Sequence, residues 1–317
     1  MLFRLLAIPN LQVFVNAPLA RYTRFGIGGP ARALLDAADE TALVEAWRAL
    51  RDSGWPREVI GGGSNLIVDD SGVPGAVLRY TENSIRFDGT TVQAGAGAVL
   101  QDLVDATIDR GLRGLETMTG IPGWVGGAVY GNAGAYGHSI EERVARVRFF
   151  DGESIREFGR AECRFAYRDS AFKHCKNWII LSVTLQMEAA DASELRSLAS
   201  SILKIRNDKY PPSMRCAGSI FKNLMLAELP ESARARVPGE VIREGKVPAA
   251  FFLEQAGAKG RSNGAIRVAD YHANLIYNTG GGSARELRSL ILDLKARVRD
   301  RFGLELEEEV QYIPAAP

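Results

Sequence analysis

The sequence is poor in histidine, has no excess of charge of either sign and lacks a long apolar run. Its formal net charge is +1 over 317 residues, so no basic field would attract nucleic acid or an anionic membrane surface. The three histidines, His138, His174 and His272, do not have the spacing of metal ligands. No segment approaches the roughly 20 apolar residues of a membrane span. We therefore expect no nucleic acid partner, no membrane insertion and no metal site.

Cysteine is equally scarce. Cys163, Cys175 and Cys216 form no CxxC pair, and their odd number leaves one thiol outside any disulfide set. A reducing compartment is the simpler interpretation. The opening residues MLFRLLAIPN have a short apolar patch but no cleavage site of small residues after it. We expect a cytoplasmic protein. The near-neutral charge gives no hint of a macromolecular partner, and we expect a monomer.

The chain has the composition of a folded protein with a core, since 46% of its residues are hydrophobic and 24% are charged. Its length predicts about two domains. Periodicity and capping residues predict helices over Thr41–Gly54, Val99–Arg110, Glu194–Ile205 and Ser283–Phe302. Strand signals occur at Glu58–Ile60, Gly75–Arg79, Thr91–Ala94, Val144–Phe150, Trp178–Gln186 and Glu305–Ile313. Strands and helices alternate in both halves, which indicates α/β or α+β folding.

Glycine is concentrated in three clusters of the first half. The longest, Gly120–Gly137 (GIPGWVGGAVYGNAGAYG), has seven glycines in eighteen residues, and the others are Gly26–Pro30 and Gly61–Asn65. A flexible linker rarely carries Ile, Trp, Val and Tyr at such intervals. Glycine lets backbone N–H groups come close to a ligand, and successive N–H groups can hold an anion. Together the clusters favour a phosphate-bearing cofactor, although tight turns would explain any one of them.

One strand–turn–helix segment resembles a dinucleotide-binding fingerprint without matching it. In Thr91–Gly111 (TVQAGAGAVLQDLVDATIDRG), Leu100 stands where the third glycine of G-x-G-x-x-G is needed for close helix–strand packing. We therefore favour a plain tight turn over a Rossmann site.

The chain carries an ordered series of motifs: TRFGIGGPA, GGGSNLIV, AGAGAVLQDLV, GLETMTGIPGWVGGAVYGNAGAYG, YRDSAFK, AGSIFKN, HANLIYN and LEEEV. From Thr23 to Ile313 this series resembles the UDP-N-acetylenolpyruvoylglucosamine reductase family. The resemblance implies an α+β fold, with a two-subdomain FAD-binding domain of the vanillyl-alcohol-oxidase (PCMH) type and an α/β substrate-binding domain after it. We place an N-terminal extension at 1–20, the FAD-binding domain at 21–189 and the substrate-binding domain at 190–317.

The resemblance also implies a reaction. NADPH would reduce FAD, and reduced FAD would reduce the enolpyruvyl ether of UDP-N-acetylglucosamine to UDP-N-acetylmuramate, a step of peptidoglycan synthesis. The residues implied in FAD binding are Gly61, Gly62, Gly63, Ser64, Asn65, Gly120, Pro122, Gly123, Gly126, Gly127, Asn132, Ala133 and Gly134. Those implied in catalysis are Arg168, Ser219 and Glu309, and those implied in binding the UDP-sugar are Tyr167, Lys209 and Asn223.

This chemistry suits the residue types. A hydride added to the CH₂ end of an enolpyruvyl group pushes negative charge onto the carboxylate, where Arg168 could bind in a fork. Ser219 would give a proton to the adjacent carbon if it is well positioned. From the residues alone, Arg168 could instead pair with Asp169, and Ser219 could be a turn serine after Gly218.

Glu309 lies in an acidic run that would ordinarily be a solvated edge strand. Strand alternation places Glu305, Glu307 and Glu309 on one face. Periodicity therefore cannot select Glu309, and only its place before Val310 matches the family's catalytic glutamate.

The chain departs from the resemblance in two places. About fifty residues separate Arg168 from Ser219, so the Tyr-bearing substrate loop of the family's first type has no room, which indicates the second type. Leu224–Ala250 is a longer charged excursion than expected, and is either a helical surface insertion or a substrate lid. Two other functions stay open: a different FAD-linked oxidoreductase of the same fold, such as an alcohol oxidase, and a nucleotide-sugar-binding protein without catalysis.

Overall fold

The computed structural model describes residues 1–314 and divides the chain into two compact units. The first unit comprises Met1–Ala17, Ala31–Gly63 and Val73–Asp208. The second comprises Pro18–Pro30, Ser64–Gly72 and the chain from Lys209 onwards. Each unit has its own cluster of buried apolar side chains.

The first unit contains a four-stranded sheet in the order β1–β2–β5–β3. Its strands are β1 (Leu11–Pro18), β2 (Pro30–Ala37), β5 (Val73–Tyr80) and β3 (Arg57–Val59). Both β2 and β3 run parallel to β5. Helix α2 (Glu40–Asp52) begins at Asp39, whose carboxylate accepts a hydrogen bond from the N–H of Ala42 (2.8 Å), and the helix buries Leu43, Trp47 and Leu50.

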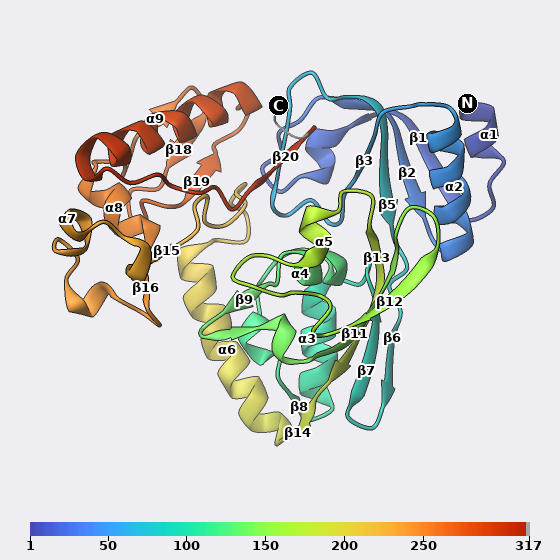
Figure 1. Cartoon of the computed structure of the whole chain (residues 1–317), viewed down its shortest axis with the longest axis horizontal. Coiled ribbons are helices and arrows are strands. Elements are labelled where there is room, and N and C mark those ends of the chain that lie inside the picture. The colour runs from blue at the N-terminus through green and yellow to red at the C-terminus, as the bar shows by residue number, and fades with distance from the viewer. Residues whose placement is uncertain (315–317) are drawn as a thin grey trace. The chain divides into compact units, whose positions relative to one another are not determined.

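The first unit also contains a five-stranded sheet, entirely antiparallel, in the order β12–β11–β13–β7–β6 (Figure 1). Its strands are β12 (Ile155–Gly159), β11 (Val144–Phe150), β13 (Ile179–Gln186), β7 (Thr91–Gly95) and β6 (Ile85–Asp88). Helix α4 (Val125–Tyr130) packs on β13 and β7, and α3 (Leu100–Asp109) packs beside α4. Because β7 has only antiparallel neighbours here, the β7–α3 segment is not part of a Rossmann unit. The remaining elements of the unit are α1 (Leu2–Leu6), β8 (Leu112–Arg113), β9 (Gly134–Ala135), β10 (His138–Ser139), α5 (Ala171–His174), β14 (Glu188–Ala189) and α6 (Ala192–Lys209).

The second unit is built around α9 (Ala284–Phe302), which packs on a small antiparallel sheet (Figure 1). Ser283 and Glu286 form a capping box at its start, and Gly303 ends it. The sheet strands are β17 (Ser262–Asn263), β18 (Ile266–Val268) and β19 (Ile276–Asn278). The other elements are β4 (Leu66–Val68), β15 (Leu224–Met225), α7 (Glu231–Arg234), β16 (Lys246–Val247), α8 (Ala249–Gln255) and β20 (Gln311–Ile313), with β20 parallel to β4.

The four predicted helices are present within a few residues of their expected ends, and the strand predicted at Val144–Phe150 is β11. The stretch Gly120–Gly137, where no helix was predicted, contains α4. Two expectations need revision. The strand predicted over Glu305–Ile313 is regular only at Gln311–Ile313, because the acidic run forms an isolated bridge between Glu308 and Phe221 instead. The segment 224–250 is closed by antiparallel pairing of β15 and β16 and holds only short helical turns.

Residues 1–15, which precede the motif series, contribute α1 and most of β1. The predicted domain boundaries stay a prediction, and helix α6 belongs almost wholly to the first unit rather than starting the second.

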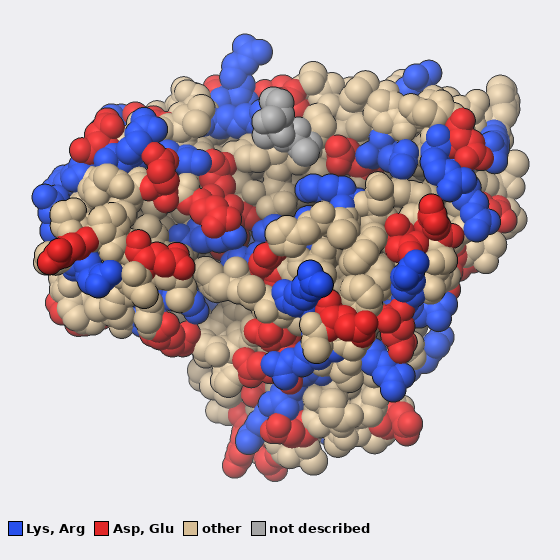
Figure 2. All heavy atoms as spheres, viewed as in Figure 1, with Lys and Arg blue, Asp and Glu red and all other residues tan. Residues whose placement is uncertain are grey.

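Lys and Arg side chains alternate with Asp and Glu over the face in Figure 2, in keeping with the near-zero net charge. Among the described residues no helix is both long enough and apolar enough to span a bilayer.

Candidate active site

The loop Gly61–Gly63 follows β3 in the first unit. It is joined to the sheet by the N–H of Ile60, which donates to the carbonyl of Leu78 (3.1 Å). The Trp124 ring lies beside exposed Gly62, where a Cβ atom would come within 3.0 Å of its Cδ1. A Cβ atom on Gly61 would meet nothing nearer than the backbone nitrogen of Gly127, 4.0 Å away. The loop and the glycine-rich stretch therefore lie against each other.

The glycine-rich stretch is held in place by its backbone. Leu100 donates to the carbonyl of Gly123 (2.9 Å), and the N–H groups of Val125 and Gly126 donate to carbonyls of the β7–α3 turn (both 2.9 Å). The N–H of Gly120 donates to Gln101 Oε1 (2.6 Å). These bonds make the stretch Gly120–Gly137 rigid, unlike a linker, and we call it the glycine wall. Pro122 lies exposed on it.

At some of these glycines neighbouring protein atoms leave no room for a Cβ atom, and at others there is room. A Cβ atom on Gly126 would lie 2.9 Å from the Cβ of Ala96, and one on Gly134 would lie 2.5 Å from the carbonyl oxygen of His138. Gly127, by contrast, would meet no protein atom within 4 Å, although glycine inside a helix costs about 0.5–1 kcal/mol relative to alanine. Packing within the unit gives no reason for glycine at 127 or 61. Close approach of a ligand gives one, so these residues fit a bound flavin nucleotide.

Asn132 and Ala133 have structural roles in this wall. Asn132 is 97% buried, its amide donates to the carbonyl of Ala166 (2.9 Å), and its Oδ1 accepts from the N–H of Glu141 (3.3 Å). The N–H of Ala133 donates to the carbonyl of Ala128, and the carbonyl of Ala133 accepts from the N–H of Ile140. These groups connect the wall to the turn that carries Tyr167 and Arg168.

Arg168 occupies a tight turn in which Ala166 and Asp169 exchange two backbone hydrogen bonds of 3.1 Å. Its φ of +57° is left-handed, a conformation that costs a residue with a side chain roughly 1–2 kcal/mol. Its guanidinium donates to the carbonyl of Gly134 (3.1 Å) and lies 5.2 Å from the ring centroid of Tyr167. A strained backbone that directs a cation beside the glycine wall is the kind of feature found at functional sites.

Ser219 lies in the second unit, in a short extended segment. On one side Ser219 bridges to Leu275, and on the other the N–H of Glu309 donates to the carbonyl of Ile220 (2.7 Å). The next pairing continues this ladder, because the N–H of Lys222 donates to the carbonyl of Glu307 (2.9 Å). The fold thus places Ser219 and Glu309 in adjacent segments of one unit.

The buried side chain of Asn274 fixes this segment. Its Oδ1 accepts from the N–H of Phe221 (2.9 Å) and its Nδ2 donates to the carbonyl of Phe221 (2.8 Å). The backbone of Asn274 also accepts from the N–H of Ile220 (3.1 Å). Sequence reasoning gave Asn274 no role, and its only signal was its place in HANLIYN.

Aromatic and basic groups surround Ser219. The Tyr210 hydroxyl lies 3.2 Å from Ser219 Oγ, and the Lys209 ammonium lies 5.1 Å from the Tyr210 ring centroid. Burial, reinforced by the charge of Lys209, lowers the pKa of His272 from its usual 6.5 to about 4. His272 is therefore neutral at pH 7, and its Nδ1 accepts from the N–H of Asn274 (3.2 Å).

The other predicted residues of the second unit lie as follows. Asn65 donates from its amide to the carbonyl of Glu309 (2.9 Å), and so holds the acidic segment. Ser64 is its half-buried neighbour in the chain. Asn223 Oδ1 accepts from the N–H of Ala249 (3.4 Å), and the carbonyl of Lys209 accepts from the Tyr271 hydroxyl (2.9 Å).

The two carboxylates before Glu309 are paired with lysines. Glu307 forms an ion pair with Lys222, and Glu308 accepts from Lys295 (2.9 Å). Glu309 is thus the member of the acidic run whose backbone joins both Asn65 and the Ser219 segment.

The predicted site residues fall into two sets. The first unit brings together Gly61–Gly63, the glycine wall, Tyr167 and Arg168, and the second brings together Asn65, Ser219 and Glu309. Their catalytic and binding roles stay predictions.

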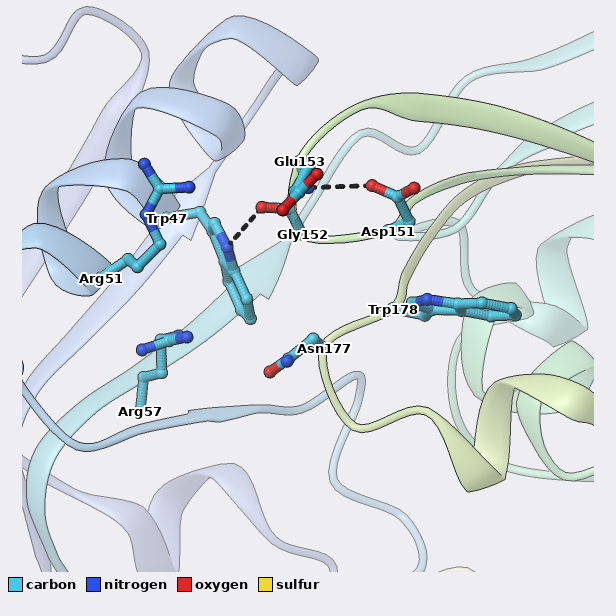
Figure 3. Close-up of a pocket in the computed structure, with 8 residues that line it drawn as sticks. All are labelled: Trp47, Arg51, Arg57, Asp151, Gly152, Glu153, Asn177 and Trp178. Carbon is cyan, nitrogen blue, oxygen red and sulfur yellow. Dashed lines mark hydrogen bonds between the residues drawn. The ribbon is translucent and has the colours of Figure 1, made fainter.

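A hollow of about 240 Å³ lies elsewhere in the first unit (Figure 3). Trp47 donates from its ring nitrogen to the carbonyl of Gly152 (3.1 Å), and the Arg57 guanidinium lies over the Trp47 ring. Its full lining is Trp47, Arg51, Arg57, Asp151, Gly152, Glu153, Asn177 and Trp178. No predicted site residue lines it.

Comparison with known proteins identifies relatives along nearly the whole chain. A family model for the C-terminal domain of UDP-N-acetylenolpyruvoylglucosamine reductase matches residues 210–313, and one for an FAD binding domain matches residues 31–155. The UDP-N-acetylenolpyruvoylglucosamine reductase of Solibacter usitatus (strain Ellin6076) is 60% identical over 310 residues, which are 98% of this chain and 99% of that protein. That of Rubrobacter xylanophilus is 37% identical over 305 residues, 94% of each chain.

A solved structure is similar over nearly the same length. The UDP-N-acetylenolpyruvylglucosamine reductase of Thermus caldophilus has a TM-score of 0.74 with this structure, at 28% identity over 95% of this chain and 98% of that one. The predicted α+β fold with an FAD-binding domain is confirmed.

Proposed function

Because the chain belongs to the UDP-N-acetylenolpyruvoylglucosamine reductase family, we propose that it reduces the enolpyruvyl ether of UDP-N-acetylglucosamine to UDP-N-acetylmuramate, with NADPH as the reductant. The observation that carries this proposal is the 60% identity to a reductase along 98% of the chain. The reaction is a step of peptidoglycan synthesis.

The cofactor of this reaction is FAD, which when bound takes a hydride from NADPH and delivers it to the substrate. The residues proposed to hold FAD are the loop Gly61–Asn65 and the wall from Gly120 to Gly134. Supporting this is the open space at Gly127 and Gly61, where a side chain would occupy the volume that a ligand needs. The wall's backbone bonds keep it rigid, so little ordering would be needed on binding.

Arg168 is proposed to stabilise the charge that develops on the substrate carboxylate. A guanidinium can bind a carboxylate with two parallel hydrogen bonds. The hydrogen bond from Arg168 to the carbonyl of Gly134 holds the side chain beside the glycine wall. A group fixed in advance is worth more in a transition state than one that must reorganise.

Ser219 is proposed to protonate the carbon next to the carboxylate, and Glu309 is proposed as a further catalytic residue. The clamp by Asn274 supports the role of Ser219, because a weak acid is effective only when it is well oriented. Asn65 supports the role of Glu309 by holding its carbonyl. Tyr167, Lys209 and Asn223 are proposed to bind the UDP-sugar, with the Lys209 ammonium facing diphosphate.

We further propose that the protein works as a monomer in the cytoplasm. Its three cysteines are free, as expected for a reducing compartment. Sedimentation velocity of the purified chain, with and without FAD, would measure its oligomeric state, and a dimer would contradict the proposal.

The function is tested by following the substrate. Purified protein is incubated with FAD, NADPH and the enolpyruvyl UDP-sugar, and the mixture is examined by proton NMR. The proposal expects the two vinyl proton signals to disappear as a methyl doublet of the lactyl ether forms. Persistence of the vinyl signals while the protein holds FAD would contradict it.

The catalytic residues are tested by three variants, Arg168→Lys, Ser219→Ala and Glu309→Gln. Ser219→Ala is expected to slow reoxidation of the reduced protein by the sugar about 10²- to 10⁴-fold, the usual contribution of a general acid. Reduction by NADPH should be unchanged in it. Full turnover of Glu309→Gln in the same half-reaction would remove Glu309 from the proposal.

A further inference from the structure

A second hydroxyl lies beside Ser219. Tyr210 comes directly after α6, and its Oη is 3.2 Å from Ser219 Oγ, so that either oxygen can donate to the other. This distance is longer than the usual 2.7–2.8 Å or so of an O–H···O bond but within reach of one. Catalytic hydrogen bonds are often long before the substrate binds and tighten afterwards.

Ser219 is a weak acid, because its hydroxyl becomes a strongly basic alkoxide when it loses its proton. In the proposed function, on which this inference rests, the Oγ–H bond breaks and a C–H bond forms on the carbon next to the substrate carboxylate. The oxygen left behind is an alkoxide, which is a far stronger base than the anion of tyrosine, whose pKa in water is about 10. A neighbouring phenol can therefore pass its proton to that oxygen downhill.

We propose that Tyr210 is a positioning residue that acts through Ser219 as a proton relay. As the Ser219 proton moves to the substrate carbon, the Tyr210 Oη–H proton moves to Ser219 Oγ. The hydride that reaches the other carbon of the enolpyruvyl group comes from reduced FAD, as in the proposed reaction. Ser219 ends the step as a neutral hydroxyl, and the phenolate of Tyr210 recovers its proton from water.

The surroundings of Tyr210 suit this relay. The Lys209 ammonium, 5.1 Å from the ring centroid, favours a transient negative charge on the phenol. The ring packs against the buried cluster of Cys216, Ala269 and Leu275, which fixes its orientation. Tyr210 is half-buried rather than sealed, so water can reach it to restore the proton.

The same segment also orients Ser219 from the other side. Asn274 holds the backbone two residues on, at Phe221, and Gly218 precedes Ser219. Ser219 Oγ is thus placed by the backbone, and Tyr210 contacts the oxygen that must be reprotonated. Removing the Tyr210 hydroxyl should affect the proton step more than the position of the segment.

The test is Tyr210→Phe, which removes one oxygen and keeps the ring. The matched control is Tyr277→Phe, the same change in a tyrosine that packs against the same cluster. With the full-length protein loaded with FAD, we expect Tyr210→Phe to slow reoxidation by the enolpyruvyl UDP-sugar about tenfold, a part of what a general acid contributes. Reduction by NADPH and the Kd for the sugar should change less than twofold, and Tyr277→Phe should match the wild type throughout.

A proton inventory separates a relay from a structural effect. The reoxidation rate is measured in mixtures of H₂O and D₂O. The wild type and Tyr277→Phe should give a curved plot, since two protons move together, and Tyr210→Phe a straight line for one proton. Equal rates in Tyr210→Phe and the wild type, or the same curvature in both, would overturn the relay. If the sugar does not reoxidise the wild type at all, the proposed function fails instead.

Discussion

Replacing Gly127 by alanine should raise the thermal stability of the protein without FAD and lower its affinity for FAD. Gly127 lies inside α4 and a Cβ atom there would meet no protein atom within 4 Å, so alanine fits the protein without FAD. Replacing a helical glycine by alanine stabilises a fold by about 0.5–1 kcal/mol. For a unit of this size that raises the Tm by about 1–4 °C. The added methyl group would, however, occupy space proposed for the flavin nucleotide.

Overpacking of this kind costs about 1–3 kcal/mol, so Gly127→Ala should weaken FAD binding about 5- to 150-fold. Thermal unfolding of the protein stripped of FAD measures the Tm, and titration followed by flavin fluorescence measures the affinity for FAD. Gly239→Ala is the matched control, because Gly239 also has open space around its Cβ position but lies outside the proposed site. Wild-type FAD affinity in Gly127→Ala would refute the reasoning that places the cofactor against this helix.

Three further predictions concern the rest of the chain. Asn274→Ala should lower the free energy of unfolding by about 2–5 kcal/mol, measured by urea titration, because it leaves the buried N–H and carbonyl of Phe221 without their partner. The unfolded chain binds the His272 proton more tightly than the folded chain, so stability should fall by about 3 kcal/mol as the pH drops from 6.5 to 4, and His272→Asn should lack this component. Iodoacetamide should label half-buried Cys175 in the native protein and leave Cys163 unlabelled in mass mapping, because burial raises the pKa of Cys163 to about 12.

Helices and strands whose ends are marked by nearby residues in the chain could be predicted from the sequence. Ser283 and Glu286 mark the start of α9 and Gly303 its end, and the run Val144–Phe150 is rich in valine and phenylalanine and ends at Asp151–Gly152, so both were predictable. Helix α4 was not, because its conformation depends on hydrogen bonds from Val125 and Gly126 to a turn about thirty residues earlier. Glycine-rich sequence has no period of its own and takes the conformation that such contacts impose.

The candidate site residues were named mainly through resemblance to the reductase family, and their roles stay predictions. Residue chemistry alone left Arg168 and Ser219 ambiguous, and alternation could not select Glu309. The contacts that organise the site join distant parts of the chain: Asn65 binds the carbonyl of Glu309, 244 residues away, and Asn274 binds Phe221, 53 residues away. Such pairs leave no pattern in a single sequence.

In the proposed function, this chain passes reducing equivalents from NADPH through FAD to the enolpyruvyl UDP-sugar. An anaerobic visible spectrum of the FAD-loaded protein tests it most directly. We expect NADPH to bleach the flavin absorbance and the sugar, added next, to restore it. A flavin that NADPH bleaches and the sugar leaves bleached would contradict the proposed substrate, and a protein that takes up no FAD would contradict the proposed role of the glycine wall.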